Sequence, residues 1–346
     1  MMSYEIGIDT IHLRQTPRLA HTEYCSNAAL KRCVAPNSDP HAPDDRLFVD
    51  AWQYDWLWQT DDGPVGWSRR GRTTDMGHGA FVADDTDLRS PRRCPFHDAE
   101  QVLEFDAVQE YGLPALDELA TYYEKRYREQ QTAHPNQVVP GGYYKTMMSG
   151  AIESFGWEML LTAAADQDGF ERVLDSFFRL SAHHFKAWAQ TSIEVFNCHD
   201  DIVWTEGPFL SWAFYRRAIF PRYAELWSML KQAGKRVLFT SDGNYTMFVE
   251  DLASAGADGF VFEPVTHLET VVQKFGRSHV IVSSKVDCRT LTFGTHDEIR
   301  REIDATLDLA FDCPGFMFAV GNHIPSNVPI DNALFFFDYL QRNWYR

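Results

Sequence analysis

The 346-residue sequence lacks the motifs by which several large classes of enzyme are recognised. It has no Gly-rich phosphate-binding turn, no Gly-x-Ser-x-Gly nucleophile turn and no His-Glu-x-x-His metal motif. Its six cysteines form no Cys-x-x-Cys pair and no compact framework. These absences disfavour P-loop and dinucleotide-binding enzymes, serine hydrolases and zinc proteases, and they indicate free thiols in a reducing cytosol rather than disulfides.

Positive charge and long apolar runs are also scarce. Lys and Arg number 32 against 49 Asp and Glu, which gives a formal net charge of -17. Such an excess repels phosphate backbones and anionic lipids, so nucleic acid is not an expected partner. The N-terminus has no basic segment followed by an apolar run, and no stretch approaches the roughly 20 apolar residues that span a bilayer. We therefore expect a cytoplasmic protein with no membrane association.

The apolar share is nevertheless 45%, which is enough to form a large core, and its distribution indicates the fold. In the C-terminal third, short β-rich apolar runs alternate with amphipathic helical segments. Eight strands are expected, at 19–24, 56–60, 137–141, 193–197, 236–240, 259–263, 279–283 and 316–320. Eight parallel strands with crossover helices predict a single-domain α/β protein over 1–346, a (β/α)8 TIM barrel. The alternative, an open doubly wound sheet, usually carries a Gly-rich turn that this sequence lacks.

The segment 61–135 between the second and third strands is rich in Arg, Asp, Gly and Pro over its first half. It includes the runs 67–72 and 90–93, in which arginines cluster. Its later part, 116–131, is helical by composition, with tyrosines on one side and charged residues on the other. We expect this excursion to form a rim or lid element over the barrel.

Polar residues follow most of the predicted strands, at the end of a barrel where active sites lie. The candidate acid or base groups are Asp61, Asp62, Asp242, Glu263 and His323. The candidate substrate-binding residues are Glu23, Tyr144, His199, Asp200, Asp201, Asn244 and Asn322. Clustered carboxylates with imidazoles can transfer protons, bind a cation or accept hydrogen bonds from a cationic substrate. The residues alone leave these three possibilities open.

Several of these segments together resemble the uroporphyrinogen decarboxylase superfamily, which also contains cobamide-dependent methyltransferases. The resemblance rests on Asp200-Asp201 with Thr205-Glu206-Gly207-Pro208, Tyr215-Arg216 to Pro221-Arg222, Thr240-Ser241-Asp242-Gly243-Asn244, Glu263-Pro264, Phe293-Gly294-Thr295, Asn322-His323-Ile324-Pro325 and Val328-Pro329-Ile330-Asp331-Asn332. Their order and spacing cover most of the chain. The resemblance implies the barrel fold, an active site at the strand ends and a homodimer.

The chain departs from the superfamily pattern in two places. Where uroporphyrinogen decarboxylases carry an Arg-Gln-Ala-Gly-Arg segment that holds substrate carboxylates, this sequence has Arg18 and then Glu23, which would repel a polyanion. The thiol-activating methyltransferases use a zinc held by a His-x-Cys pair and a later Cys. Here those positions carry Thr240 and Asp242, with Gly321 or Asn322 in place of the last Cys. An oxygen-and-imidazole zinc site remains open, with Glu23, His199, Asp242 and His323 as candidate ligands.

The resemblance implies an enzyme that moves a methyl group from a small methoxylated or methylamine-type substrate to a cobamide on a separate corrinoid protein. In that reaction an acid among Asp242, Glu263 and His323 would protonate or coordinate the leaving heteroatom. One alternative is a decarboxylase acting on a porphyrinogen or a smaller carboxylate, with Asp61 or Asp62 stabilising a developing cation. The other is a ligand-binding barrel that has lost its chemistry.

Overall fold

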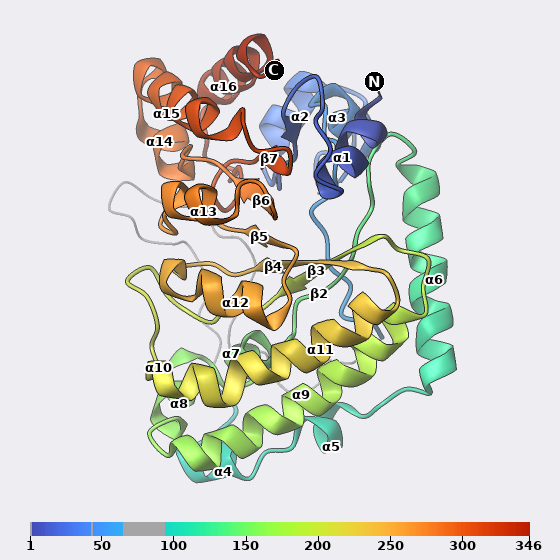
Figure 1. Ribbon diagram of the computed structural model, residues 1–346, viewed down its shortest axis with the longest axis vertical. Helices are drawn as coiled ribbons and strands as arrows, with labels where there is room; N and C mark the ends of the chain where they lie inside the picture. The colour runs from blue at the N-terminus through green and yellow to red at the C-terminus, as the bar shows by residue number, and fades with distance from the viewer. Residues whose placement is uncertain (1, 43, 65–93) are drawn as a thin grey trace.

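The computed structural model describes residues 2–42, 44–64 and 94–346, and its centre is a parallel sheet (Figure 1). In these ranges the strands are β1 Ala20–His21, β2 Gly141–Tyr143, β3 Val195–His199, β4 Arg236–Thr240, β5 Gly259–Val261, β6 Val280–Ser283 and β7 Phe316–Phe318. Their order is β1-β7-β6-β5-β4-β3-β2, and every neighbouring pair is parallel. The first strand therefore lies beside the last, as in a barrel.

The segment 55–57 closes the ring between β1 and β2. On one side the Asp55 amide donates to the His21 carbonyl at 2.8 Å. On the other side Trp56 pairs in parallel with Val138, and the Val138 amide donates to the Asp55 carbonyl at 3.0 Å. This segment is the expected second strand, reduced to one bridge, so the predicted (β/α)8 barrel class is confirmed.

Side chains alternate between the inside and the outside of the ring, as the period of a strand requires. Leu238, Val261 and Met317 belong to a small inner apolar cluster that the helix α1 (Ser3–Ile11) joins through Ile6 and Ile11. The intervening strand residues join a much larger cluster under the surrounding helices. These apolar side chains pack inside the barrel. The polar side chains of the candidate site lie at the carboxyl ends of the strands.

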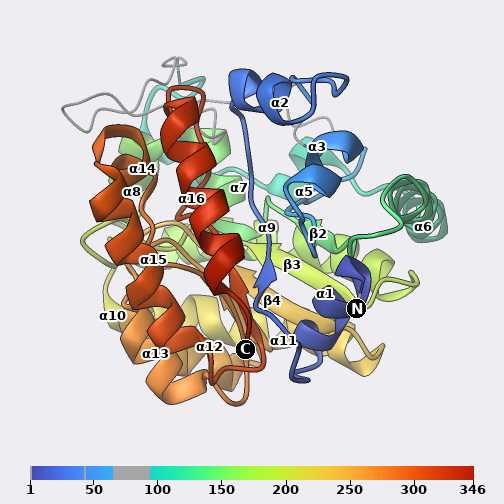
Figure 2. The ribbon, with the colours of Figure 1, turned by 90° about the horizontal axis from the view of Figure 1, so that it is seen from above.

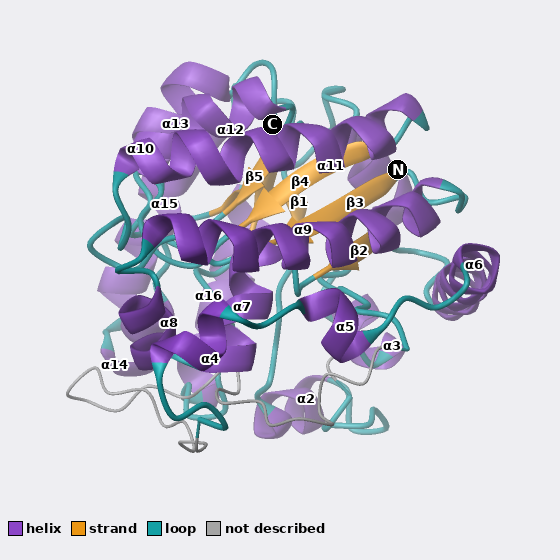
Figure 3. Cartoon of the chain, turned by 90° about the horizontal axis from the view of Figure 1, so that it is seen from below, coloured by secondary structure: helices purple, strands orange, loops and turns teal. Residues whose placement is uncertain are grey.

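Helices surround the sheet on all sides. They are α2 Ala28–Val34, α3 Arg46–Ala51, α4 Ala99–Leu103, α5 Ala107–Tyr111, α6 Leu116–Ala133, α7 Met147–Phe155, α8 Trp157–Ala163, α9 Gln167–Ala189, α10 Trp212–Phe214, α11 Phe220–Gln232, α12 Val249–Ala255, α13 Leu268–Phe275, α14 Cys288–Phe293, α15 His296–Ala310 and α16 Ile330–Asn343. A π-helical turn, Tyr215–Ile219, precedes α11, and a 3-10 turn, Thr246–Phe248, precedes α12. In Figure 3, β3 and β4 are seen between α11 and α9, two helices that contact each other, and α15 lies beside α16 (Figure 2).

Local sequence explains where several helices begin. Thr295 caps α15, and Glu298 accepts a hydrogen bond from the Thr295 amide, so the two residues form a capping box. Asp166 caps the long α9 through the Gly169 amide. Within the described ranges, no helix combines the length and apolar character that crossing a membrane requires.

The excursion after the second strand is only partly described. Residues 65–93, which include the arginine runs 67–72 and 90–93, lie outside the described residues. The remainder contains α4, α5 and α6, and α6 confirms the helix predicted at 116–131. A second difference concerns β3, which was predicted at 193–197 and forms two residues later. His199 is therefore the last residue of the strand itself, where it pairs with Thr240 of β4.

Candidate functional site

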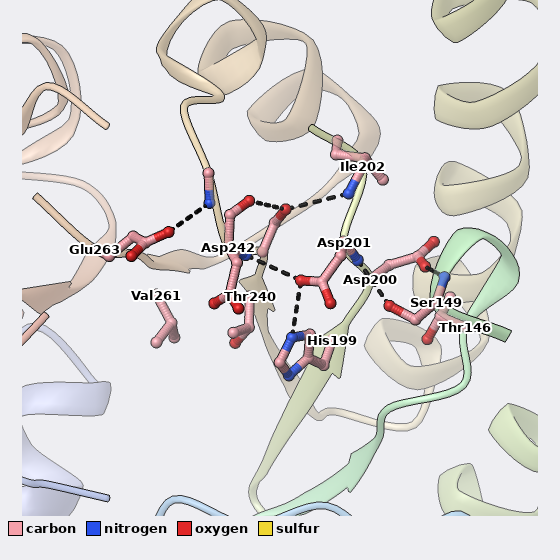
Figure 4. Close-up of polar contacts among 12 residues, drawn as sticks. Thr146, Ser149, His199, Asp200, Asp201, Ile202, Thr240, Asp242, Val261 and Glu263 are labelled. Carbon is pink, nitrogen blue, oxygen red and sulfur yellow. Dashed lines mark hydrogen bonds and ion pairs between the residues drawn. The ribbon is translucent and has the colours of Figure 1, made fainter. Parts of the chain in front are cut away.

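Three predicted site residues meet at the carboxyl ends of β3 and β4. One ligand atom from each of His199, Asp201 and Asp242 lies within 4.8 Å of the other two (Figure 4). His199 and Asp201 are buried and Asp242 is half-buried. The strands bring them together because β3 and β4 are neighbours in register, so residues that follow them reach the same edge.

Asp201 is the centre of this group. Its Oδ1 accepts hydrogen bonds from His199 Nε2 at 3.1 Å and from the Asp242 amide at 3.0 Å. Its own amide donates to Ser149 Oγ at 2.8 Å, which ties it to α7. Burial acts to raise the pKa of Asp201, but the charge and hydrogen bond of His199 bring that pKa below its usual value. Asp201 is therefore ionised near neutral pH.

Glu263 approaches the same group from β5. Its Oε1 accepts the Gly243 amide at 2.7 Å, and its pKa is raised, chiefly by burial and further by the negative charges of Asp287 and Asp201. Gly243 has φ +83° and lies against the backbone of Trp204, where an added Cβ would approach a carbonyl oxygen to 2.7 Å. The Asp242-Gly243 turn thus requires glycine to present its amide to Glu263.

A buried lysine adjoins the group and was not predicted. Lys145 is 2% exposed and forms ion pairs with Glu153 of α7 and, at 3.9 Å, with Asp62. Its ammonium lies 4.3 Å from the ring of Tyr144, and that ring lies 3.9 Å from the His199 ring. The sequence feature that could have indicated this lysine is Glu153. It is the single charged residue of α7, a helix whose residues are all buried.

Asp61 and Asp62, which follow the second strand, contact different parts of the protein. Asp62 accepts the Tyr144 amide at 2.7 Å, and burial raises its pKa against the effect of Lys145. Asp61 instead lies toward α6, where its carboxylate is 3.4 Å from Tyr122 Oη and 3.6 Å from Arg126 Nε. Asp62 is therefore the one of the pair that contacts the Tyr144 and Lys145 segment.

The remaining candidates on β1 and β7 form other local contacts. Glu23 is buried, accepts the Val320 amide at 2.8 Å, and lies 3.2 Å from His21 Nε2. His323 is buried with its Nδ1 2.6 Å from Asn322 Oδ1. Neither Glu23 nor His323 joins the three-residue group that the described part of the chain provides for a metal. Asn244 accepts from the amide and hydroxyl of Thr246, so it shapes the turn before α12.

Asp200 lies between helices. Its carboxylate accepts the Ser149 amide at 2.6 Å and the Tyr223 hydroxyl at 2.5 Å, which joins α7 to α11. It is fully buried, and burial raises its pKa to about 7. Asp200 therefore positions the helix that carries Ser149, the partner of Asp201.

This raised pKa predicts a pH dependence of stability. The folded state holds the Asp200 proton up to about pH 7 and the unfolded state releases it near pH 4. Stability from this group is thus complete below the unfolded pKa and is lost as pH rises through the folded pKa, by about 1 kcal/mol per pH unit. Urea unfolding between pH 5 and 8 measures the free energy of unfolding of wild type and Asp200→Asn. This free energy should fall more steeply with pH in wild type than in Asp200→Asn. An equal pH dependence in the two proteins would contradict the prediction.

Comparison with known proteins adds the family. The family model described as "Uroporphyrinogen decarboxylase (URO-D)" matches residues 98–343. The chain belongs to the uroporphyrinogen decarboxylase family. It is 26% identical over 175 residues to a uroporphyrinogen decarboxylase of Pelobacter propionicus, and 28% identical over 173 residues to one of Syntrophotalea carbinolica. These matches cover 51% and 50% of this chain, and they span about half the length of the relatives, 49% and 48%.

The fold of this uroporphyrinogen decarboxylase family member also occurs in a solved methyltransferase from Methanosarcina mazei. The two chains are 15% identical, align over 99% of each chain and have a TM-score of 0.65. At that identity the likeness concerns the fold.

Arg18, which lies where the resemblance located carboxylate-binding arginines, is already paired within the barrel. Arg18 is buried, and its Nη1 and Nη2 bind the two carboxylate oxygens of Asp55 at 2.7 and 2.8 Å. Asp55 is on the closing segment of the barrel and is itself fully buried. The Arg18 guanidinium is thus held in the barrel wall by its ion pair with Asp55.

Proposed function

We propose that this protein transfers a methyl group from a small methoxylated or methylamine-type substrate to a cobamide carried by a corrinoid protein. The observation that carries the proposal is the concentration of acidic groups at the ends of β3, β4 and β5, where Asp201 and Asp242 lie beside His199 and Glu263 binds the Gly243 amide next to Asp242. Membership of the uroporphyrinogen decarboxylase family supports the proposal that the protein is an enzyme.

In this reaction the bond between the methyl carbon and its heteroatom breaks, and the bonding electrons stay on the heteroatom. That heteroatom needs a proton or another electrophile as it leaves. The pKa of Glu263 is raised by desolvation, and this shift favours the protonated form of the carboxylic acid, which is the form that donates. We assign it the proton donor's role, while ionised Asp201 holds His199 in place.

The cobamide, when bound, supplies a low-valent cobalt that accepts the methyl carbon. The residues of this chain bind and orient the methyl donor. The ring of Tyr144, which packs against His199 and lies beside the Lys145 ammonium, provides an aromatic wall beside the acidic group. An aromatic wall with nearby carboxylates suits a small donor that is neutral or cationic.

The same features disfavour a polyanionic tetrapyrrole. Its carboxylates would meet Asp201 and Asp242, and each like-charge contact would cost about 1 kcal/mol or more at partly buried distances. Arg18, the one residue that the sequence offered as a counter-charge on the first strand, is already paired with Asp55. A second candidate function is decarboxylation of a smaller carboxylate, which is favoured by the two uroporphyrinogen decarboxylases among the relatives.

The deciding experiment mixes the purified protein with cob(I)alamin and a panel of methoxylated and methylamine compounds, and follows the cobalamin spectrum. Methylated cobalamin that depends on both protein and one donor class is the expected result. A parallel tube measures carbon dioxide release from porphyrinogen and from small carboxylates. Carbon dioxide release without methyl transfer would replace the proposal with the decarboxylase. Neither activity, together with ligand binding unchanged by replacing Asp242 and His323, would identify a non-catalytic barrel.

Two further properties belong to the proposal. All six cysteines are free thiols, which supports a reducing, cytoplasmic location. A homodimer is expected from the family resemblance, and size-exclusion chromatography with light scattering measures it directly.

A further inference from the structure

We infer that His199, Asp201 and Asp242 bind one divalent cation of the Zn²⁺ class. In the described ranges, this is the one group of three or more such side chains whose ligand atoms all lie within 4.8 Å of one another. The inference concerns ion binding and does not require the proposed methyl transfer.

The donor set fits a borderline cation. It has one imidazole nitrogen and two carboxylates, so two negative charges balance a divalent ion with a neutral histidine. His199 Nε2 and Asp201 Oδ1 are already 3.1 Å apart, a spacing close to that of two ligands on one small ion. An ion between these atoms replaces the hydrogen bond that they now share.

Thiolate ligation does not fit. Cys198 is the cysteine adjacent to His199, but it lies on the outer face of β3 with the helix-covered core. On the inner face, Thr240 and Asp242 offer oxygens instead. We therefore expect oxygen and nitrogen ligands, including His199 of β3, in place of the cysteine-based zinc site that the resemblance implies for thiol-activating relatives.

A second observation points to a ligand beneath the group. Asn197 is fully buried, and its Nδ2 has no hydrogen-bond partner among the described residues, while its Oδ1 accepts from Thr240 Oγ1. It precedes His199 by two residues, so both side chains lie on the same face of β3. Leaving a buried donor without a hydrogen bond is unfavourable, and a water or anionic group held by the cation would satisfy it.

The ligands are held in place before any ion binds. The Tyr144 ring covers one face of His199 at 3.9 Å, and the Ser149 hydroxyl accepts the Asp201 amide. Such supporting contacts orient metal ligands and increase affinity. Three protein ligands leave a coordination position open, where a substrate heteroatom can bind.

The test titrates chelator-treated, full-length protein with ZnCl2 by calorimetry and with CoCl2 by visible absorption. One Zn²⁺ per chain is expected, and both His199→Gln and Asp242→Asn should weaken binding by about 100-fold or more, since even supporting residues account for 10- to 100-fold. Asp242→Asn keeps the amide that binds Asp201, so the fold should persist, and circular dichroism checks this.

The matched control is Asp331→Asn. His296 and Asp331 form an exposed histidine–aspartate pair at the same 3.1 Å but lack a third ligand, so this variant should bind Zn²⁺ like wild type. Absence of one-to-one binding in wild type would overturn the inference, as would wild-type affinity in folded Asp242→Asn. Either result leaves the methyl-transfer assay free to succeed or fail independently.

Discussion

Replacing Glu263 with glutamine is expected to lower the rate of methyl transfer by about 100- to 1000-fold, the usual contribution of a positioned proton donor. Glutamine has nearly the same shape, and its Oε1 can still accept the Gly243 amide that now binds at 2.7 Å. The variant should therefore fold normally and bind substrate with little change in KM. Steady-state methylation of cobalamin, with kcat and KM measured separately, checks this.

The pH profile distinguishes proton donation from a purely structural role. The protonated form of Glu263 is the active one, and its pKa is raised by burial, so the wild-type rate should fall as pH rises through that raised pKa. Glu263→Gln should lose this limb of the profile. Because Glu263 is outside the His199 group, the variant should also keep Zn²⁺ binding. A wild-type kcat in Glu263→Gln would refute the assignment.

Much of the barrel could be predicted from local pattern. β4 forms over Arg236–Thr240, the predicted range, because a buried parallel strand reads as a continuous apolar run. The second strand was harder to bound, since its pairing is reduced to Trp56 and depends on bonds to His21 and Val138, which lie far away in sequence. Periodicity reports which face is buried and not which partner a strand finds.

The candidate site was predictable as a set of strand ends but not as a geometry. His199, Asp201 and Asp242 meet because β3 and β4 are neighbours, which barrel topology implies. Nothing in the sequence distinguishes Asp201, which contacts His199, from Asp200, which points into the helix layer toward Tyr223. Adjacent residues at a strand end point to opposite sides, and the register that decides between them is a tertiary property.

Replacing Arg18 with methionine is expected to destabilise the protein by about 3–5 kcal/mol, because the fully buried Asp55 would lose its charged partner. The guanidinium binds both carboxylate oxygens, donates to the Leu19 carbonyl at 2.8 Å and lies 4.3 Å from the Trp344 ring. It thus joins β1, the closing segment and the C-terminal residues. Urea unfolding of Arg18→Met against wild type measures the loss.

A double variant separates the pair from its surroundings. Arg18→Met with Asp55→Asn removes both charges, so it should recover part of the stability lost in Arg18→Met, and the double-mutant cycle yields the coupling. Below its unfolding temperature, Arg18→Met should also retain the wild-type KM, because Arg18 is bound to Asp55 rather than directed at substrate. A large rise in KM with unchanged stability would instead make Arg18 a substrate-carboxylate ligand, and would return the polyanionic substrates to consideration.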